Sequence, residues 1–436
     1  MCPSPRLQFF ASGIFRERFS TKFAVRAITF DIGSRTSAEV FRASFWLHEV
    51  TLDHSGRGTA MKCLLGVRPF VLVGVSLLTT MAAPASATSI TLTNLVSDIP
   101  GLAQITDPAL KNPWGLSFSG TSPFWVSNQV TNTADLFTVH GTTVTQNALE
   151  VSIPTTGGGP QGPTGQVNNN TSAFPVGTAP ASFIFANLNG TISAWNNSAG
   201  TTAQIKVTTP GAVYTGLAIS NVGGTPLLYA ANTAQNSIDV FNGSFAPAVL
   251  GPNAFSNPFP GLVPFNVENI GGKIYVTYAL PGRPAQIAAT EGQGAVAVFD
   301  TNGVLIQTLI DGSALASPWG LTLAPAGFDV FGGALLVGNF SFAAPEINAF
   351  NPNTGAFLGQ VLGNPSYQGL WALSFGNGGS GGDPGILYFT TGLNGETDGL
   401  FVAAASVPEP ASLLLLGSGL LSVWGGRRIV RIRRRA

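Results

Sequence analysis

One carboxylate beside an amide is the best candidate for chemistry in this chain. Glu268 and Asn269 lie in the stretch LVPFNVENI, where we expect a strand that faces the centre of a ring of repeats. Carboxylate and amide oxygens are the ligands that Ca²⁺ prefers in proteins. The pair is therefore a weak candidate for a calcium site, structural or catalytic, because the other predicted inner strands add no second carboxylate.

Asparagines and tryptophans recur at matching positions along the chain. Four asparagines end apolar stretches of similar composition: Asn128, Asn187, Asn232 and Asn339. Their oxygens could ligate a cation, but asparagine also caps tight turns, and we favour that role. Three tryptophans begin other stretches: Trp114, Trp319 and Trp371. Such rings could stack on a sugar, but we expect them to pack between repeats.

Nucleophilic catalysis and phosphate binding find little support. His140 is the one histidine between residues 88 and 406, and the surrounding VHGTT predicts a hairpin turn rather than a Ser-His-Asp arrangement. Glycine-rich stretches such as GGGPQGPTG precede no predicted helix, so they lack the helix N-terminus that binds phosphate. We therefore assign no catalytic residue.

The charge pattern excludes nucleic acid as a partner. Residues 88–406 hold fourteen Asp and Glu but four Lys and Arg, for a net charge near −10. A protein that binds duplex DNA needs basic residues to displace phosphate counterions. Both cysteines, Cys2 and Cys63, lie outside this region, so we expect neither a disulfide framework nor thiol chemistry within it.

The region 88–406 contains six copies of one unit. Each copy starts with a turn and a small apolar strand, at intervals of 50 to 54 residues, centred on Trp114, Thr164, Thr215, Phe265, Trp319 and Trp371. A second strand (FWVSNQ in the first unit) and a third (ADLFTV) follow, with a fourth where there is room. Repeats of about 50 residues with four strands each are typical of β-propeller blades.

The sequence therefore predicts an all-β fold, a six-bladed β-propeller, over residues 88–406. The last unit stops after three strands at Ala405. The segment SITLTNLV, residues 89–96, can supply its missing outer strand, which would close the ring through its two ends and leave no open edge. A seventh blade would need a seventh inner strand, and we find none in the sequence.

Residues 61–87 have the three parts of a secretory signal peptide. A basic start and an apolar run lead to an A-x-A cleavage site formed by Ala85 and Ala87. A membrane anchor is the alternative, but the apolar run is short. Residues 1–60 precede this signal, so we interpret them as an untranslated or disordered extension, with a translated cytoplasmic extension as the alternative.

Residues 407–436 combine an extended motif, a short apolar segment and an arginine-rich end. Pro408-Glu409-Pro410 disfavours helix, because proline fixes φ and restricts the residue before it. Residues 411–424 are mostly apolar but fall short of the ~20 residues that span a bilayer as a helix. Six arginines follow, which would hold the end on the cytoplasmic side. This order suits proteolysis at the motif while a short transmembrane segment holds the tail; a plain anchor is the alternative.

This tail resembles the PEP-CTERM sorting signal that exosortases recognise in Gram-negative, matrix-producing bacteria. Residues 90–405 are similar to exported propeller-like proteins that carry the same signal, notably in NLVSDIPGLAQITDPALKNPWGLSFSGTSPFWVSN, FIFANLNGTISAWN and VPFNVENIGGKIYVTYA. The resemblance implies export across the inner membrane, processing by an exosortase-type membrane protease, and the cell surface or extracellular matrix as destination. It implies no particular chemistry.

Two functions from different classes remain open. The first is a binding or structural module of the surface or matrix, with exopolysaccharide as a partner, since low charge and Thr-, Ser- and Asn-rich turns suit a hydrated polysaccharide. The second is a Ca²⁺-dependent hydrolase similar to six-bladed lactonases, with the metal in the axial channel. We favour the first, and hence a role without catalysis. Convergent oxygen ligands on the axis would favour the hydrolase, whereas an apolar plug would count against it.

Overall fold

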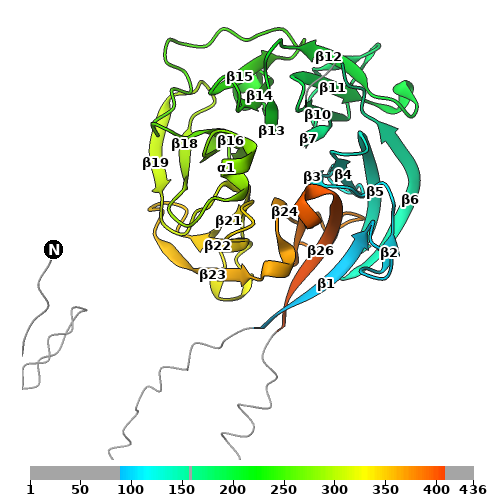
Figure 1. Ribbon diagram of the computed structural model, residues 1–436. Helices are drawn as coiled ribbons and strands as arrows, with labels where there is room; N and C mark the ends of the chain where they lie inside the picture. Colours follow the sequence, from blue (N-terminus) through cyan, green and yellow to red (C-terminus); the bar gives the residue numbers. More distant parts are fainter. Residues whose placement is uncertain (1–88, 157–159, 408–436) are drawn as a thin grey trace, which may run out of the picture. The chain divides into compact units, whose positions relative to one another are not determined.

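The computed structural model describes residues 89–156 and 160–407. They form six β-sheets arranged around a central axis, a six-bladed β-propeller (Figure 1). The all-β class and the number of blades predicted from the repeats are confirmed. Each predicted inner strand is the axial edge strand of one blade.

Within blades 1 to 5 the strands follow one another outward in chain order. Blade 1 consists of β3 (Pro113–Ser117), β4 (Phe124–Asn128), β5 (Thr133–His140) and β6 (Thr143–Ser152). Blade 2 consists of β7 (Pro163–Asn168), β10 (Phe183–Asn187), β11 (Thr191–Trp195) and β12 (Gln204–Thr208). Blade 3 has three strands, β13 (Tyr214–Ser220), β14 (Leu227–Asn232) and β15 (Ser237–Asn242). Blade 4 consists of β16 (Val263–Ile270), β17 (Lys273–Ala279), β18 (Gly294–Phe299) and β19 (Leu305–Asp311). Blade 5 consists of β20 (Pro318–Leu323), β21 (Leu335–Asn339), β22 (Glu346–Phe350) and β23 (Phe357–Gly363).

Blade 6 is built from both ends of the described chain. Its strands are β24 (Leu370–Phe375), β25 (Leu387–Gly392), β26 (Asp398–Val407), β1 (Ser89–Ser97) and the short β2 (Ile105–Thr106). The remaining small elements are the hairpin of β8 (Pro175–Val176) and β9 (Ala179–Pro180), the short helices α1 (Arg283–Ile287) and α2 (Leu393–Glu396), and the 3-10 turns η1 (Asn197–Ala199), η2 (Val222–Gly224), η3 (Asp329–Phe331) and η4 (Pro365–Tyr367).

Burial explains the different sequence patterns of the strands. The second strands are packed on both faces between neighbouring blades, and β4, β10, β14 and β21 are buried along their whole length. They therefore read as continuous apolar runs. The outer strand β6 is instead exposed at most of its positions, and its sequence TVTQNALEVS alternates more clearly.

The six inner strands share a β-bulge at the position that marked each repeat. Pairing with the second strand shifts register around Trp114, Thr164, Thr215, Phe265, Trp319 and Trp371. A bulge twists the strand locally and changes the direction of a side chain. Four of these residues, the three tryptophans and Phe265, meet in one hydrophobic cluster with Phe340.

The predicted closure of the ring is also confirmed. β1 pairs antiparallel with β26, from Ser89 opposite Val407 to Ser97 opposite Leu400. The two ends of the propeller therefore lie side by side at the outer edge of blade 6 (Figure 1). Asp98, just after β1, accepts hydrogen bonds from the backbone N–H of Gly399 at 2.8 Å and from Lys111 Nζ at 2.5 Å.

The two predicted processing segments lie outside the described residues. These are the signal peptide with Ala85 and Ala87, and the tail that begins with Pro408-Glu409-Pro410. Within residues 89–156 and 160–407, no helix is long and apolar enough to cross a membrane. The transmembrane segment expected at residues 411–424 stays a prediction.

Candidate functional site

Aromatic side chains fill the centre of the propeller. The indole rings of Trp114 and Trp371 stack with their centroids 3.5 Å apart, and Trp319 meets both edge-on at 6.1 and 5.6 Å. Phe340 stacks on the other side of Trp371 at 4.3 Å. All four side chains are buried. This axial plug confirms that the tryptophans pack between blades, and it leaves them no open face for a sugar.

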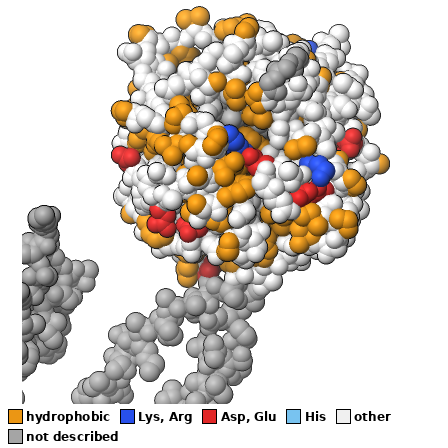
Figure 2. Space-filling view, viewed as in Figure 1, with side chains coloured by type: hydrophobic (Ala, Val, Ile, Leu, Met, Phe, Trp, Pro, Cys, Tyr) orange, Lys and Arg blue, Asp and Glu red, His pale blue; other side chains and the backbone are white. Residues whose placement is uncertain are grey.

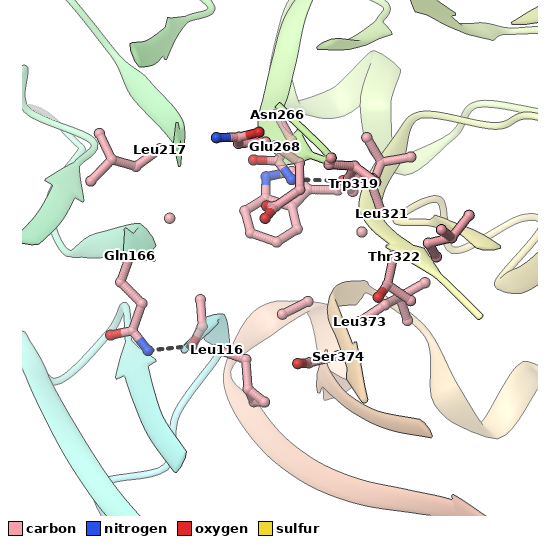
Figure 3. Close-up of a pocket in the computed structure, with 18 residues that line it drawn as sticks. Leu116, Gln166, Leu217, Asn266, Glu268, Trp319, Leu321, Thr322, Leu373 and Ser374 are labelled. Carbon is pink, nitrogen blue, oxygen red and sulfur yellow. Dashed lines mark hydrogen bonds between the residues drawn. The ribbon is translucent and has the colours of Figure 1, made fainter. Parts of the chain in front are cut away.

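The plug separates two cavities at opposite ends of the inner strands. The first, which we call the Glu268 cavity, has a volume of about 340 Å³ and is lined by inner-strand residues of all six blades, among them Leu116, Gln166, Leu217, Glu268, Leu321 and Leu373. Figure 3 shows the side chain of Glu268 pointing into this space. The sequence prediction that Glu268 reaches the axis is therefore correct in geometry.

Glycines explain why backbone lies so close to the axis here. A Cβ built on Gly320 would lie 2.3 Å from the carbonyl oxygen of Trp371 in the next inner strand. A Cβ on Gly216 would lie 2.1 Å from Asn266 Oδ1, also in the next blade. Adjacent inner strands can approach this closely only where one of them lacks a side chain.

Glu268 is a half-buried carboxyl without a partner. It forms no hydrogen bond or ion pair with any residue that the structure describes. Burial without a compensating donor disfavours the charged form, and this raises the pKa of Glu268 to about 8. At neutral pH the isolated carboxyl is therefore largely protonated.

The neighbouring amides are already used by the fold. Asn269 donates from Nδ2 to the carbonyl of Ile219 at 2.8 Å and accepts from the backbone N–H of Gly272 at 3.1 Å. Asn266 donates to the carbonyl of Trp319 at 2.8 Å. Ca²⁺ takes six to eight oxygen ligands, usually with several carboxylates. Within the described residues no three His, Cys, Asp or Glu side chains converge in a metal-binding group, so the residues at Glu268 do not fit a calcium centre.

Replacing Glu268 with glutamine is expected to stabilise the protein increasingly as the pH rises. The folded-state pKa of about 8 lies above the unfolded value, so Glu268 favours folding at low pH and loses that contribution as the pH rises through 8. Glutamine keeps the shape of the protonated acid and does not titrate. Melting temperatures of wild type and E268Q should coincide near about pH 5, and E268Q should melt several degrees higher near about pH 9. A constant difference across this range would contradict the assignment.

The four asparagines at the ends of second strands bind backbone and neighbouring side chains. Three of them hold the loop that enters the inner strand of their own blade: Asn187 accepts from Gly162 N–H at 3.0 Å, Asn232 from Val213 N–H at 3.2 Å, and Asn339 from Ala316 N–H at 3.0 Å. In blade 1, Asn128 donates to Thr133 and Asp135 instead. All four are fully buried. Asn232 also caps its own turn, as expected, by accepting from Gln235 N–H at 3.2 Å, whereas Asn339 binds the preceding loop at Ala314 and Ala316. His140 lies exposed at the hairpin between β5 and β6, as predicted.

The second cavity, which we call the Arg283 pocket, lies where the inner strands begin. Its volume is about 580 Å³, and its lining includes Trp114, Leu188, Val213, Thr233, Arg283 and Glu396. Arg283 begins α1, the short helix near the axis in Figure 1. Charged side chains are sparse on the face of the propeller in Figure 2. Arg283 and Glu396 are the two ionisable residues among those that line this pocket.

Arg283 is held between the aromatic plug and a carboxylate. Its guanidinium carbon lies 4.0, 4.7 and 4.9 Å from the ring centroids of Phe340, Trp371 and Trp114. Its Nε donates to Glu396 Oε2 at 2.8 Å, and its Nη2 donates to Glu396 Oε1. Burial lowers the pKa of Arg283 to about 9, so the guanidinium stays charged at neutral pH.

A strained turn places the carboxylate of Glu396. Asn394, Gly395 and Glu396 all have positive φ, at 51°, 70° and 71°. Such conformations cost about 1–3 kcal/mol for a residue with a side chain and are concentrated at ligand-binding sites. Asn112 connects the turn to the plug: its Nδ2 donates to Glu396 Oε1 at 3.1 Å, and its Oδ1 accepts from Trp371 Nε1 at 2.8 Å.

Sequence reasoning missed the Arg283 pocket. Arg283 and Glu396 are 113 residues apart and belong to different blades, so no local pattern connects them. One signal was available: Arg283 is one of four basic residues between 88 and 406, and it lies in a stretch, PGRPAQIAAT, that interrupts the series of strands.

Comparisons with known proteins identify the tail. Residues 406–429 match the family model of the PEP-CTERM protein-sorting motif. Two uncharacterised proteins of Acanthamoeba polyphaga mimivirus are each 29% identical to the chain, one over 326 residues (70% of this chain and 78% of that protein) and one over 324 residues (70% and 83%).

Two solved structures are similar to most of the chain. The streptogramin B lyase structure matches with a TM-score of 0.45 and 11% identity, covering 73% of this chain and 98% of that one. The soluble aldose sugar dehydrogenase from Escherichia coli matches with a TM-score of 0.47 and 11% identity, covering 73% and 100%. Neither likeness carries a conclusion about activity.

Proposed function

We propose that this protein, whose PEP-CTERM motif implies export and exosortase processing in Gram-negative bacteria, is a binding module for a neutral extracellular polysaccharide. The observation that carries the proposal is the Arg283 pocket. Its volume of about 580 Å³ lies within the range of about 300–1,000 Å³ typical of sites for small ligands. A few sugar units of a chain would occupy it.

The lining of the pocket suits a sugar better than a purely apolar ligand. Leu188 and Val213 offer apolar surface, and Thr233 and Gln129 add a hydroxyl and an amide that also hydrogen-bond to the backbone of Pro264 and Gln161. Trp114 forms part of the floor of the pocket, with its ring and its Nε1–H buried in the axial plug. Apolar walls with a small number of placed polar groups are typical of selective ligand sites.

The charges favour a neutral ligand. Residues 88–406 carry a net charge near −10, which repels polyanions at long range. Within the pocket, Glu396 already neutralises Arg283 through two hydrogen bonds. A polysaccharide without carboxylate or sulfate groups therefore meets no electrostatic barrier at this site.

Processing would deliver the propeller alone to the surface or matrix. We propose cleavage after Ala87 and at Pro408-Glu409-Pro410, with residues 88–406 as the mature domain. This proposal is supported by the strand pairing between Ser89 and Val407, because both expected cleavage points directly flank the folded ring.

A lactonase-like hydrolase is less well supported. The axial plug of Trp114, Trp319, Trp371 and Phe340 occupies the channel in which such an enzyme would hold its metal. The one carboxyl in the Glu268 cavity lies among amides that are already hydrogen-bonded to the fold. We therefore favour binding over hydrolysis.

Filling the pocket is expected to abolish sugar binding without unfolding the protein. Ala234 is exposed and lines the Arg283 pocket, so Ala234→Trp would place an indole across its opening. Affinity for neutral oligosaccharides, measured by calorimetry, should fall by about tenfold or more, which corresponds to ~1.4 kcal/mol. Ala246→Trp is the matched control, because Ala246 is exposed in the same blade and is absent from the pocket lining. Equal binding by both variants would refute the pocket as the sugar site.

A further inference from the structure

The Glu268 cavity has no part in the proposed sugar site, and it contains a carboxyl that the fold leaves without a partner. The axial plug lies between this cavity and the Arg283 pocket. Glu268 is the single ionisable residue among those that line the cavity. Figure 3 shows its carboxyl directed into the space.

Even a half-buried carboxyl without a hydrogen-bond partner lowers the stability of a fold unless something balances it. Burying an acid without a hydrogen-bond partner destabilises a protein, whereas a leucine or glutamine at this position would avoid that cost. Position 268 belongs to the inner strand β16, which also contains Asn266 and Asn269, both hydrogen-bonded within the fold. Glu268 is therefore the polar side chain of this strand that has no partner among the described residues, and a ligand of opposite charge would balance it.

The walls around Glu268 add backbone hydrogen-bonding groups for such a ligand. β16 and β20 are axial edge strands, so the side of each strand that faces the axis has no ladder partner. Unpaired strand edges present both backbone carbonyl oxygens and N–H groups. The glycines at 115, 165 and 320 bring this backbone to the cavity surface, since a side chain there would collide with the next strand. A group with several N–H donors and a positive charge would match one carboxylate and nearby carbonyls.

The leucines define the rest of the ligand. Leu116 and Leu323 line the cavity with partly exposed apolar side chains from two blades, whereas Leu217, Leu321 and Leu373 are almost fully buried between blades. A strongly hydrated metal ion gains nothing from such a wall, whereas an alkyl chain loses unfavourable contact with water. An ammonium group on a flexible aliphatic stem combines the two features, because it presents three donors at its tip and apolar surface behind them.

We propose that the Glu268 cavity binds a primary alkylammonium group, with the ammonium holding the Glu268 carboxyl in its ionised form and the alkyl stem against Leu116 and Leu323. The cavity of about 340 Å³ has room for a chain of a few carbons. The same chemistry occurs in free alkylamines and in the lysine side chain of a protein. The site is separate from the Arg283 pocket, so it does not depend on the proposed sugar-binding function.

The proposal is tested by calorimetric titration of the propeller, residues 88–406, with n-pentylammonium. Residues 89–407 form one closed ring, so this domain is suitable for the measurement. We expect saturable binding to wild type, and at least about tenfold weaker binding to E268Q. E268Q keeps the size and shape of the acid, and the melting curve of each variant confirms that it is folded. The matched control, Glu291→Gln, removes a carboxylate from an exposed loop and should leave the affinity unchanged.

Further ligands separate the alternatives. Pentan-1-ol, which has the same stem without the charge, should bind at least about tenfold more weakly than n-pentylammonium. Competition by Nα-acetyl-lysine methylamide would identify a lysine side chain as the natural source, and its absence would point to free amines. The proposal is overturned if wild type shows no saturable binding, if E268Q binds equally well, or if Ca²⁺ displaces the amine at an equal concentration.

Discussion

Deleting residues 89–97 is expected to abolish the cooperative unfolding transition of the propeller. β1 is the strand that covers β26, and Leu95 and Val96 within it are completely buried. Burying a leucine or valine side chain is worth about 1.5–3 kcal/mol each. These two side chains alone therefore supply about 3–6 kcal/mol of a total stability that is typically about 5–15 kcal/mol. Loss of the strand would also leave β26 with unpaired backbone groups along the edge of blade 6.

The measurement is thermal unfolding followed by near-ultraviolet circular dichroism, which reports on the packed aromatic rings. The deletion variant should show no sharp transition and should aggregate more readily than wild type. A circular permutant serves as the control: it keeps residues 89–97 but joins them to the end of β26, so it tests whether closure needs the strand itself rather than its place at the start of the domain. Because Ser89 lies opposite Val407, a short turn can join residue 407 to residue 89, with new termini in the loop between β1 and β3. This permutant should regain the transition; a deletion variant that melts like wild type would show that closure is dispensable.

Trp371→Ala is expected to be the most damaging single substitution in the axial plug. Trp371 is fully buried and stacks on Trp114 and Phe340, and its Nε1 donates to Asn112 Oδ1 at 2.8 Å. Replacing a buried tryptophan with alanine typically costs about 3–5 kcal/mol. The substitution also removes one of the three rings beneath Arg283. We therefore expect lower stability together with a disturbed Arg283 pocket.

Urea unfolding measures this cost as a shift of the midpoint at constant slope. Trp371→Phe is the matched control, because it keeps an aromatic ring and loses the indole N–H. It should cost less than the alanine variant, about 1–3 kcal/mol, mainly because Asn112 loses its donor. Equal stability of the alanine variant and wild type would contradict the central packing role of Trp371.

The sequence alone determined the repeating architecture of this protein. Six inner strands at intervals of 50 to 54 residues, each followed by apolar strands, predicted six blades, and the incomplete last unit predicted that β1 would close the ring. These features can be predicted from the sequence because each strand has its own local pattern and that pattern recurs six times. The sorting motif can also be predicted from the sequence, because its parts follow one another directly in residues 406–429.

The tertiary structure decided which side chains meet at the axis. Trp114, Trp319 and Trp371 come from three blades and touch only because bulges turn each of them inward once the ring is closed. Arg283 and Glu396 also come together only when the ring is closed. They form a pocket that no short stretch of sequence could predict. Glu268 and Asn269 line the same cavity but differ in role, because the fold uses the Asn269 amide in hydrogen bonds to Ile219 and Gly272 and leaves the Glu268 carboxyl without a partner among the described residues. Contacts across a closed ring depend on the geometry of all six blades, so they emerge only when the whole chain is folded.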